Sequence, residues 1–264
     1  MREAVFAYLV AITAMFSMLT CTRAATAAPT FTLPEDTIIF RSDFSSVSAA
    51  SFISQLMRHK GRTVTIWLDS PGGSVFALDQ MISAVKASGK RTVCITGFSA
   101  SASFMFLQAA CDVRLVQPNS VLMSHQAATA YRGEVNRIES FKKLIDGMLL
   151  RLDKMVSSRI GLSVEELRAK SADEWWVQGD AAVDNKLADK VAYFKCSSKM
   201  INSTYEEIVQ VFIFTFNLTW SKCPIITHPV QVNGEPQFYQ GESLDASTRF
   251  MQHKDYYLKD AFAP

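Results

Sequence analysis

Short apolar runs alternate with amphipathic stretches along residues 37–191. The apolar runs are rich in Val, Ile, Leu and Thr, and they predict strands at 37–40, 62–68, 91–96, 113–116 and 121–123. Apolar residues at helical spacing predict helices at 45–59, 76–87 and 104–110. Pro118-Asn119 predicts a turn before the last of these strands. Strands that alternate with helices of this length favour an α/β domain with a largely parallel sheet.

One amphipathic stretch is much longer than the others. From Gly133 to Ile160, apolar residues recur at steps of three and four, which predicts a long helix with one apolar face. Ser163-Val-Glu-Glu166 then has the pattern of a capping box and predicts the start of a further short helix. Core packing explains the apolar face of the long helix, and a contact between subunits would be an additional role.

Beyond Cys196 the pattern changes. Residues Val211–Trp220 alternate strictly and predict a strand whose aromatic face comprises Phe212, Phe214, Phe216, Leu218 and Trp220. This segment is far too short to span a membrane. The chain therefore divides into an N-terminal segment, 1–28, a main domain, 31–196, and a C-terminal extension, 197–264, whose role the sequence does not indicate.

The N-terminal segment has the layout of a targeting sequence. Residues 4–19 are almost wholly apolar, follow a short charged start, and precede small residues at Ala25-x-Ala27. This layout is typical of a secretory signal peptide, with cleavage expected after Ala27 or Ala28. The alternative is an uncleaved membrane anchor, because about 17 apolar residues just reach the lower limit for spanning a bilayer. We therefore expect a periplasmic or secreted protein, or one anchored to the membrane.

Charge and cysteine content narrow the choice of partners and compartment. The 264 residues carry a formal net charge of +2 with acidic and basic residues intermixed, so neither a nucleic-acid partner nor a polybasic membrane patch is predicted. Without the first 28 residues, four cysteines remain, and an even count in an exported protein suggests disulfides. Three pairings are possible, and the sequence does not choose among them. Our hypothesis joins Cys94 to Cys111 and Cys196 to Cys223.

A serine-rich turn separates the strand 91–96 from the helix 104–110. Residues 97–103 read Gly-Phe-Ser-Ala-Ser-Ala-Ser. A serine between a strand and a helix N-terminus exposes its hydroxyl, and the first helical amides favour negative charge nearby. Two further stretches accompany this turn: Asp-Ser-Pro-Gly-Gly-Ser-Val at 69–75 and Pro-Asn-Ser-Val-Leu-Met-Ser-His at 118–125.

In order and spacing, these three stretches resemble the proteolytic subunit of Clp protease. Ser101 follows Gly73 by 28 residues and precedes His125 by 24, and both gaps are within about a residue of that family's pattern. The resemblance covers residues 37–191. It implies a Clp/crotonase-type α/β fold, a spiral of β-β-α units with a long handle-type helix, to which this chain adds a C-terminal extension.

The resemblance also implies a serine peptidase site with assigned roles. Ser101 would be the nucleophile and His125 the base that takes its proton. The backbone N–H groups of Gly73 and Ala102 would form the oxyanion hole, where glycine lets the backbone approach a substrate closely. Ser99 and Ser103 are expected to pack the turn and the helix. The family's usual methionine and glycine after the serine are replaced here by Ala102 and Ser103, which would alter the binding cleft.

The third member of the triad is harder to place. In the family an acidic residue lies shortly before a Gly-Leu-Val-Asp segment, which here reads Asn-Lys-Leu-Ala-Asp at 185–189 and lacks the glycine. Counting back from Leu187 favours Glu174, whereas matching the aromatic pair at 175–176 favours Asp173. We select Asp173, with Glu174 as the alternative.

These residues predict a serine-type endopeptidase that cleaves unfolded proteins or peptides outside the cytoplasm without ATP. Polypeptide substrates and a homo-oligomer are expected, while an ATPase partner, a cofactor and a metal are not. The alternatives are a catalytically inactive peptide-binding scaffold of the same fold and a crotonase-type acyl-CoA enzyme. The related signal peptide peptidases use a serine–lysine pair, and the position of His125 within its own motif argues against that mechanism.

Overall fold

The computed structural model describes residues 28–128, 130–211 and 214–235. In chain order, its elements are β1 (Thr30–Thr32), β2 (Ile38–Phe40), α2 (Ser46–Arg58), β3 (Thr63–Ser70), α3 (Val75–Ser88), β4 (Arg91–Ala100), α4 (Ala102–Ala110), β5 (Val113–Ser124), α5 (Val135–Ile160), α6 (Val164–Lys170), β6 (Trp175–Gln178), α7 (Asp180–Asp184), β7 (Lys190–Val191), β8 (Tyr193–Lys195), α8 (Ser198–Asn202), β9 (Thr204–Val211), β10 (Phe214–Ser221) and β11 (Gln231–Glu235).

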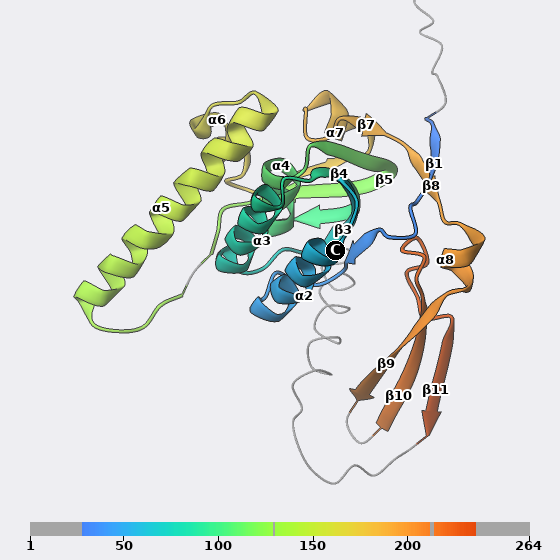
Figure 1. Cartoon of the computed structure of the whole chain (residues 1–264). Coiled ribbons are helices and arrows are strands. Elements are labelled where there is room, and N and C mark those ends of the chain that lie inside the picture. Colours follow the sequence, from blue (N-terminus) through green and yellow to red (C-terminus); the bar gives the residue numbers. More distant parts are fainter. Residues whose placement is uncertain (1–27, 129, 212–213, 236–264) are drawn as a thin grey trace, which may run out of the picture.

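A six-stranded sheet forms the centre of the fold (Figure 1). Its strands follow the order β2-β3-β4-β5-β6, and the short β7 pairs with β5 as well. Strands β2 to β5 are parallel to one another, and β6 is antiparallel to β5. The predicted α/β architecture with a largely parallel sheet is therefore confirmed.

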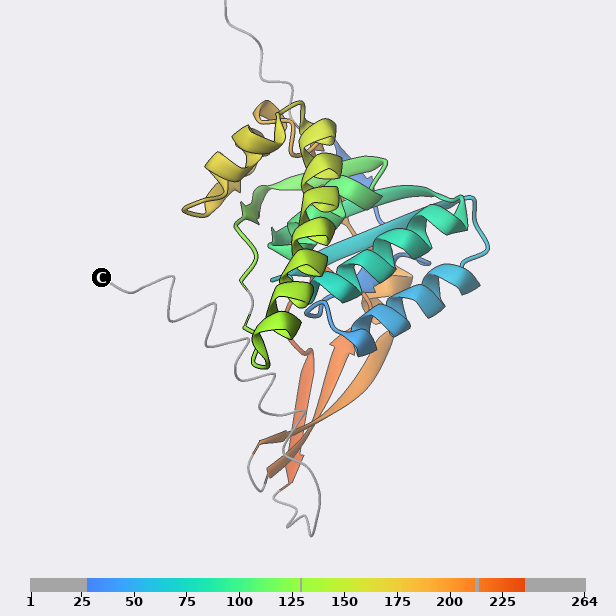
Figure 2. The same ribbon diagram turned by 90° about the vertical axis from the view of Figure 1, so that its left-hand side faces the viewer.

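Successive side chains of a strand point to opposite sides of a sheet, and a hydrophobic cluster covers each face of this one. In β3, Val64, Ile66 and Leu68 join the main hydrophobic core with α2, α3 and α4. Trp67 of β3 and Ile95 of β4 belong to a second cluster on the opposite face, together with the end of the main domain and the start of the C-terminal extension. Figure 2 shows α2 and α3 side by side on the first of these faces.

The predicted turn at Pro118-Asn119 lies inside a single strand. β5 pairs with β4 on both sides of it, and the register shifts between Thr96 and Phe98 of β4. The hydroxyl of Ser120 closes the bulge, because it accepts a hydrogen bond from the Gln117 N–H at 2.7 Å and donates to the Thr96 carbonyl at 2.6 Å. The bulge lets β5 continue beyond the turn to the end of the sheet.

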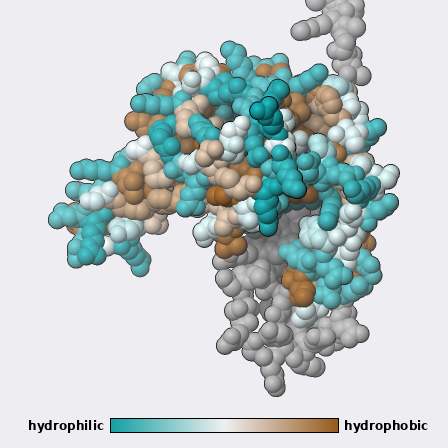
Figure 3. Space-filling model, viewed as in Figure 1, coloured by the Kyte–Doolittle hydropathy of each residue, from teal (hydrophilic) through white to brown (hydrophobic). Residues whose placement is uncertain are grey.

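The long helix predicted at 133–160 is α5. Its buried residues all lie at or beyond residue 145: Ile145, Leu152, Asp153, Val156, Ser157 and Ile160. The first turns extend away from the sheet, and Val135 and Leu144 are exposed there. Figure 3 shows apolar side chains along this helix and hydrophilic ones at its far end. The predicted capping box is also present, since Ser163 and Glu166 cap each other's backbone N–H groups at the start of α6.

The C-terminal extension forms a second, three-stranded sheet, in the order β11-β10-β9. The single strand expected at 211–220 is in fact the end of one strand and most of the next, because β9 and β10 pair antiparallel with Val211 opposite Phe214. Phe212, which was assigned to the aromatic face, lies outside the described residues.

Two disulfides brace the structure, and they are the pairs of our hypothesis. Cys94 in β4 is bonded to Cys111 at the end of α4, with their Cα atoms 5.8 Å apart. Cys196 is bonded to Cys223 and ties the extension to the main domain. Among residues 28–235, apart from the gaps at 129 and 212–213, no helix is long and apolar enough to cross a membrane.

Candidate active site

Ser101 occupies the sharp turn between β4 and α4. Its backbone has φ 55° and ψ −121°, a conformation that side-chain-bearing residues rarely adopt. The turn is held on both sides, because the Ser101 N–H donates to the Met123 carbonyl at 2.9 Å and its own carbonyl accepts from the Met105 N–H at 3.1 Å. A strained serine at the start of a helix is the arrangement found around serine nucleophiles in α/β hydrolases.

His125 follows β5 directly and lies beside this serine. Since β4 and β5 are parallel, with Ala100 opposite Met123, the residues that follow the two strands emerge next to each other. The imidazole Nε2 lies 2.8 Å from the Ser101 hydroxyl oxygen. At this distance a neutral imidazole with its proton on Nδ1 accepts a hydrogen bond from the hydroxyl, which is the geometry of a nucleophile and its base. The structure thus brings together the residues assigned as nucleophile and base.

The neighbouring serines have other partners. The hydroxyls of Ser99 and Ser103 lie 2.8 Å from each other, and both side chains are fully buried. Each hydroxyl is the hydrogen-bond partner of the other inside the turn, where a buried hydroxyl without a partner would destabilise the fold. Of the three serines in the turn, Ser101 is therefore the one whose hydroxyl is directed at a histidine.

Gly72 and Gly73 form a loop that presses against Ser101 from the other side. Both have positive φ angles, 103° and 138°. A Cβ on Gly72 would lie 2.6 Å from the Ser101 Cβ and 2.8 Å from the Ala102 backbone nitrogen. Only glycine fits so close to another backbone at such angles. The residues assigned as oxyanion donors, Gly73 and Ala102, therefore flank the nucleophile on adjacent segments.

Phe44 holds this glycine loop in place. Its N–H donates to the Gly72 carbonyl at 2.7 Å, and its carbonyl accepts from the Ser74 N–H at 2.7 Å. Phe44 thereby forms an isolated parallel bridge with Gly73. Backbone groups of an extended segment point alternately to its two sides, so the Gly73 N–H points away from Phe44. The sequence motifs contained no signal for Phe44, because it belongs to a separate segment of the chain that precedes α2.

The two candidates for the third member of the triad lie just before β6. Asp173 is exposed, and within the described part of the chain no hydrogen bond or ion pair joins either Asp173 or Glu174 to His125. Glu174 has φ 64°, and its carboxylate accepts a hydrogen bond from the Trp176 indole N–H at 2.9 Å. The sequence choice of Asp173 thus has no contact in its favour.

The register of β5 and β6 distinguishes the two acids. These strands are antiparallel with Ser124 opposite Trp175, so one further step places Glu174 opposite His125. The paired part of the two strands ends at Ser124 and Trp175, and Glu174, the next residue along, has left the regular strand conformation. By position in the register, Glu174 precedes Asp173 as the candidate, while its carboxylate is bonded to Trp176.

A buried pair of hydroxyls supports the segment that carries the histidine. The Ser124 and Ser171 hydroxyls lie 2.8 Å apart, and both residues are almost fully buried. This bond joins the end of β5 to the turn that leads into β6. Sequence reasoning included Ser124 in a motif but missed Ser171, because nothing in the local pattern distinguishes it from a solvated serine.

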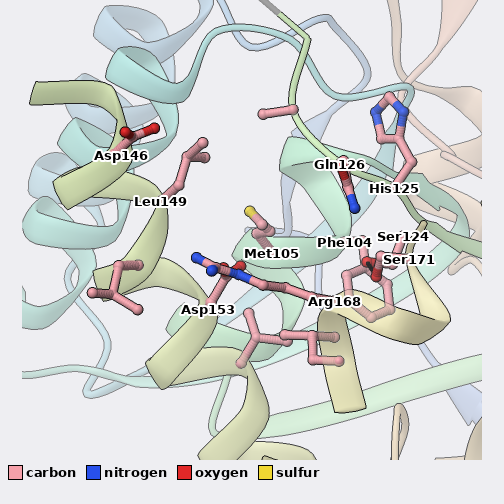
Figure 4. Close-up of a pocket in the computed structure, with 14 residues that line it drawn as sticks. Phe104, Met105, Ser124, His125, Gln126, Asp146, Leu149, Asp153, Arg168 and Ser171 are labelled. Atoms are coloured by element: carbon pink, nitrogen blue, oxygen red, sulfur yellow. Dashed lines mark hydrogen bonds and ion pairs between the residues drawn. The ribbon is translucent and has the colours of Figure 1, made fainter. Parts of the chain in front are cut away.

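A cavity of about 540 Å³ opens beside His125, between α4, α5 and α6. Its walls include Phe104, Met105 and Leu149, and Arg168 reaches across to Asp153 (Figure 4). The Arg168 Nε lies 2.8 Å from a carboxylate oxygen of Asp153, which is 8% exposed. Half of the residues that line the cavity are apolar and half are polar or charged, and a cavity with both kinds of wall is suited to a side chain of a bound peptide. The sequence did not indicate this pair, because neither residue belongs to a motif and the two lie on different helices.

Among the described residues, no group of three or more His, Cys, Asp and Glu side chains is arranged to hold a metal ion.

The sequence of the chain is similar to known proteins. The model of the Clp protease family matches residues 24–194, more than half of the chain. The chain belongs to the Clp protease family. One curated relative is the ATP-dependent Clp protease proteolytic subunit 2 of Treponema denticola, which is 25% identical over 162 residues, covering 59% of this chain and 80% of the relative.

Membership of the Clp protease family confirms the predicted fold and supports a Clp-type peptidase. Members of this family form oligomers and cleave polypeptides. The family match ends at residue 194, so β9, β10 and β11 lie beyond the part of the chain that it covers.

Proposed function

We propose that this member of the Clp protease family is a serine endopeptidase that acts outside the cytoplasm on unfolded proteins or peptides. One observation carries the proposal: the Ser101 hydroxyl, in a strained strand-to-helix turn, lies 2.8 Å from the Nε2 of His125. A hydroxyl is a weak nucleophile until a base takes its proton, and this contact supplies the base.

In the proposed reaction, the Ser101 oxygen attacks the carbonyl carbon of the peptide bond while its proton passes to His125. The negative charge that forms on the carbonyl oxygen is stabilised by the N–H groups of Gly73 and Ala102. His125 then gives the proton to the leaving amine, and a water molecule activated by the same imidazole releases the acyl group from Ser101.

For the third member of the triad we propose Glu174 in place of Asp173. The β5–β6 register supports this choice, since its continuation sets Glu174 opposite His125, whereas Asp173 is one residue further along. A carboxylate beside Nδ1 would hold the imidazole in the tautomer that leaves Nε2 free to accept the serine proton.

Export is supported by the two disulfides, because such bonds persist in oxidising compartments. The signal sequence expected at 1–28 lies almost wholly outside the described residues. Outside the cytoplasm no ATP-driven unfoldase is expected, so the proposed substrates are chains that are already unfolded. We also propose a homo-oligomer, for which the exposed apolar residues on the first turns of α5, Val135 and Leu144, are available.

Labelling with a fluorophosphonate probe tests the proposal, because such probes react with activated serines. We expect covalent modification of the intact protein at Ser101, identified by peptide mass mapping. Ser101→Ala should abolish it, and Ser103→Ala, which removes a buried hydroxyl nearby, is the matched control and should still be labelled. A folded sample that neither labels nor cleaves unfolded casein would contradict the proposal and favour a peptide-binding scaffold.

A further inference from the structure

Arg41, directly after β2, joins the C-terminal extension to the main domain. Its guanidinium donates hydrogen bonds to the carbonyls of Pro224 and Ile226, the second at 3.3 Å. Both carbonyls closely follow Cys223, which the disulfide holds to Cys196. A guanidinium offers five N–H donors in a rigid fork, so one side chain fixes two backbone positions at once.

The same guanidinium lies beside Asp69, near the end of β3. The Arg41 Nε is 3.8 Å from a carboxylate oxygen of Asp69, and both side chains are about three-quarters buried. Burial raises the pKa of Asp69, while the charge of Arg41 and a hydrogen bond from the Phe98 backbone N–H offset part of the rise. A positive partner favours the ionised form of a largely buried carboxylate, and Arg41 has this effect on Asp69.

Arg41 and Asp69 each begin one of two neighbouring segments, 42–44 and 70–73, and the second of these contains the glycine loop. The Ser70 hydroxyl donates to the Ser42 carbonyl at 2.6 Å and accepts from the Gly72 N–H at 3.2 Å. Two residues beyond Ser42, Phe44 makes its bridge to Gly73. The ion pair thus lies where the paired strands β2 and β3 lead into two segments, and the far end of one of them carries Gly72 beside Ser101.

We propose that Arg41 is a positioning residue for the peptidase reaction, and that the C-terminal extension is needed for the full catalytic rate because it holds Arg41. The extension fixes the guanidinium, the guanidinium fixes Asp69 and the start of the Ser42–Phe44 segment, and these fix the glycine loop. This inference rests on the proposed function.

The test uses the full chain and compares three variants with the wild type. Arg41→Met removes the charge and all the donors, Arg41→Lys restores a charge beside Asp69, and Cys196→Ala/Cys223→Ala releases the segment that Arg41 holds. Lys199→Met is the matched control. Lys199 lies on the same extension and forms an exposed ion pair with Glu35 of the main domain, and its loss leaves the contacts of Arg41 in place. The readouts are kcat, KM and the rate of fluorophosphonate labelling.

We expect Arg41→Met and the double cysteine variant to lower kcat about tenfold or more with KM little changed, because a displacement of about 1 Å at a reacting centre can cost about a hundredfold. Arg41→Lys should recover part of the loss, and Lys199→Met should match the wild type. Rates are measured well below each variant's melting temperature, so a loss of stability alone leaves kcat unchanged.

The two proposals fail in different ways. If the wild type neither labels nor cleaves, the proposed function is wrong. If the wild type is active and the folded variants of Arg41 and of the disulfide keep its kcat, the positioning role is wrong. Where Arg41→Met does not fold, Arg41→Lys and the double cysteine variant decide the question.

Discussion

The backbone of Gly72 passes so close to Ser101 that an added Cβ would lie 2.6 Å from the Ser101 Cβ. Both residues have positive φ angles, 103° and 55°, so two unusual backbone conformations face each other across the candidate site. Each is held by a hydrogen bond to another segment, from the Phe44 N–H in one case and to the Met123 carbonyl in the other. The close approach brings the backbone of the glycine loop next to Ser101 with no side chain of Gly72 between them.

Gly72→Ala should therefore lower kcat by about a hundredfold, because the loop must move away from Ser101. Gly89→Ala is the matched control: Gly89 also has a positive φ, 62°, but an added Cβ meets nothing within 4 Å. It should cost about 1–2 kcal/mol of stability and leave kcat unchanged. Peptidase rates and urea unfolding of both variants test this, and equal kcat values would contradict it.

Ser101 and His125 are expected to act as one unit. Ser101→Ala and His125→Ala should each lower kcat by about 10⁴-fold or more, and the double variant should be no slower than the worse single variant. Kinetics on an unfolded substrate measure all three. Multiplicative losses would show that the 2.8 Å contact is not part of the reaction.

Glu174→Gln should lower kcat by up to about 10⁴-fold, since the imidazole would lose the group that holds its tautomer. Asp173→Asn, a neutral substitution at the adjacent exposed position, should have little effect. Comparing the two variants in the same assay assigns the third role. The opposite ranking would return that role to Asp173.

Acid should destabilise the fold partly through Asp189. Burial opposes ionisation of this carboxyl, but hydrogen bonds and charge from Arg114, with a contribution from Arg159, outweigh it and hold its pKa below the ordinary 3.8. Because the folded pKa is the lower one, the stabilisation is present above the ordinary value and is lost as pH falls through the folded pKa. Urea unfolding should show a weaker acid dependence in Asp189→Asn than in the wild type, and an unchanged dependence would contradict this.

Removing the Cys94–Cys111 disulfide should lower the free energy of unfolding by about 3 kcal/mol, the value expected for a closed loop of this length. Cys94→Ala/Cys111→Ala, measured by urea unfolding, tests this. A reductant should lower the free energy of unfolding of the wild type. It should lower that of the variant by less, because the variant has only the Cys196–Cys223 disulfide left to reduce. A variant as stable as the oxidised wild type would contradict the prediction.

Local chemistry explains why much of the fold was predictable. The helix expected at 45–59 is α2, and the strand expected at 62–68 is β3 with small changes at its ends. The capping box at Ser163 was predictable because both of its hydrogen bonds join residues three apart. The strand 211–220 was mispredicted because two adjacent strands share one alternating pattern, and period alone does not reveal where a chain reverses.

Short-range patterns and the spacing of three motifs were enough to predict most helices and strands of the main domain and the candidates for nucleophile and base. Which distant residues lie next to each other became clear from the folded chain alone. Ser124 of β5 lies opposite Trp175 of β6, the Gly72 backbone reaches Ser101, and Arg41 connects the extension to Asp69. These contacts join residues far apart along the chain, so their geometry depends on strand pairing and packing that no local pattern encodes.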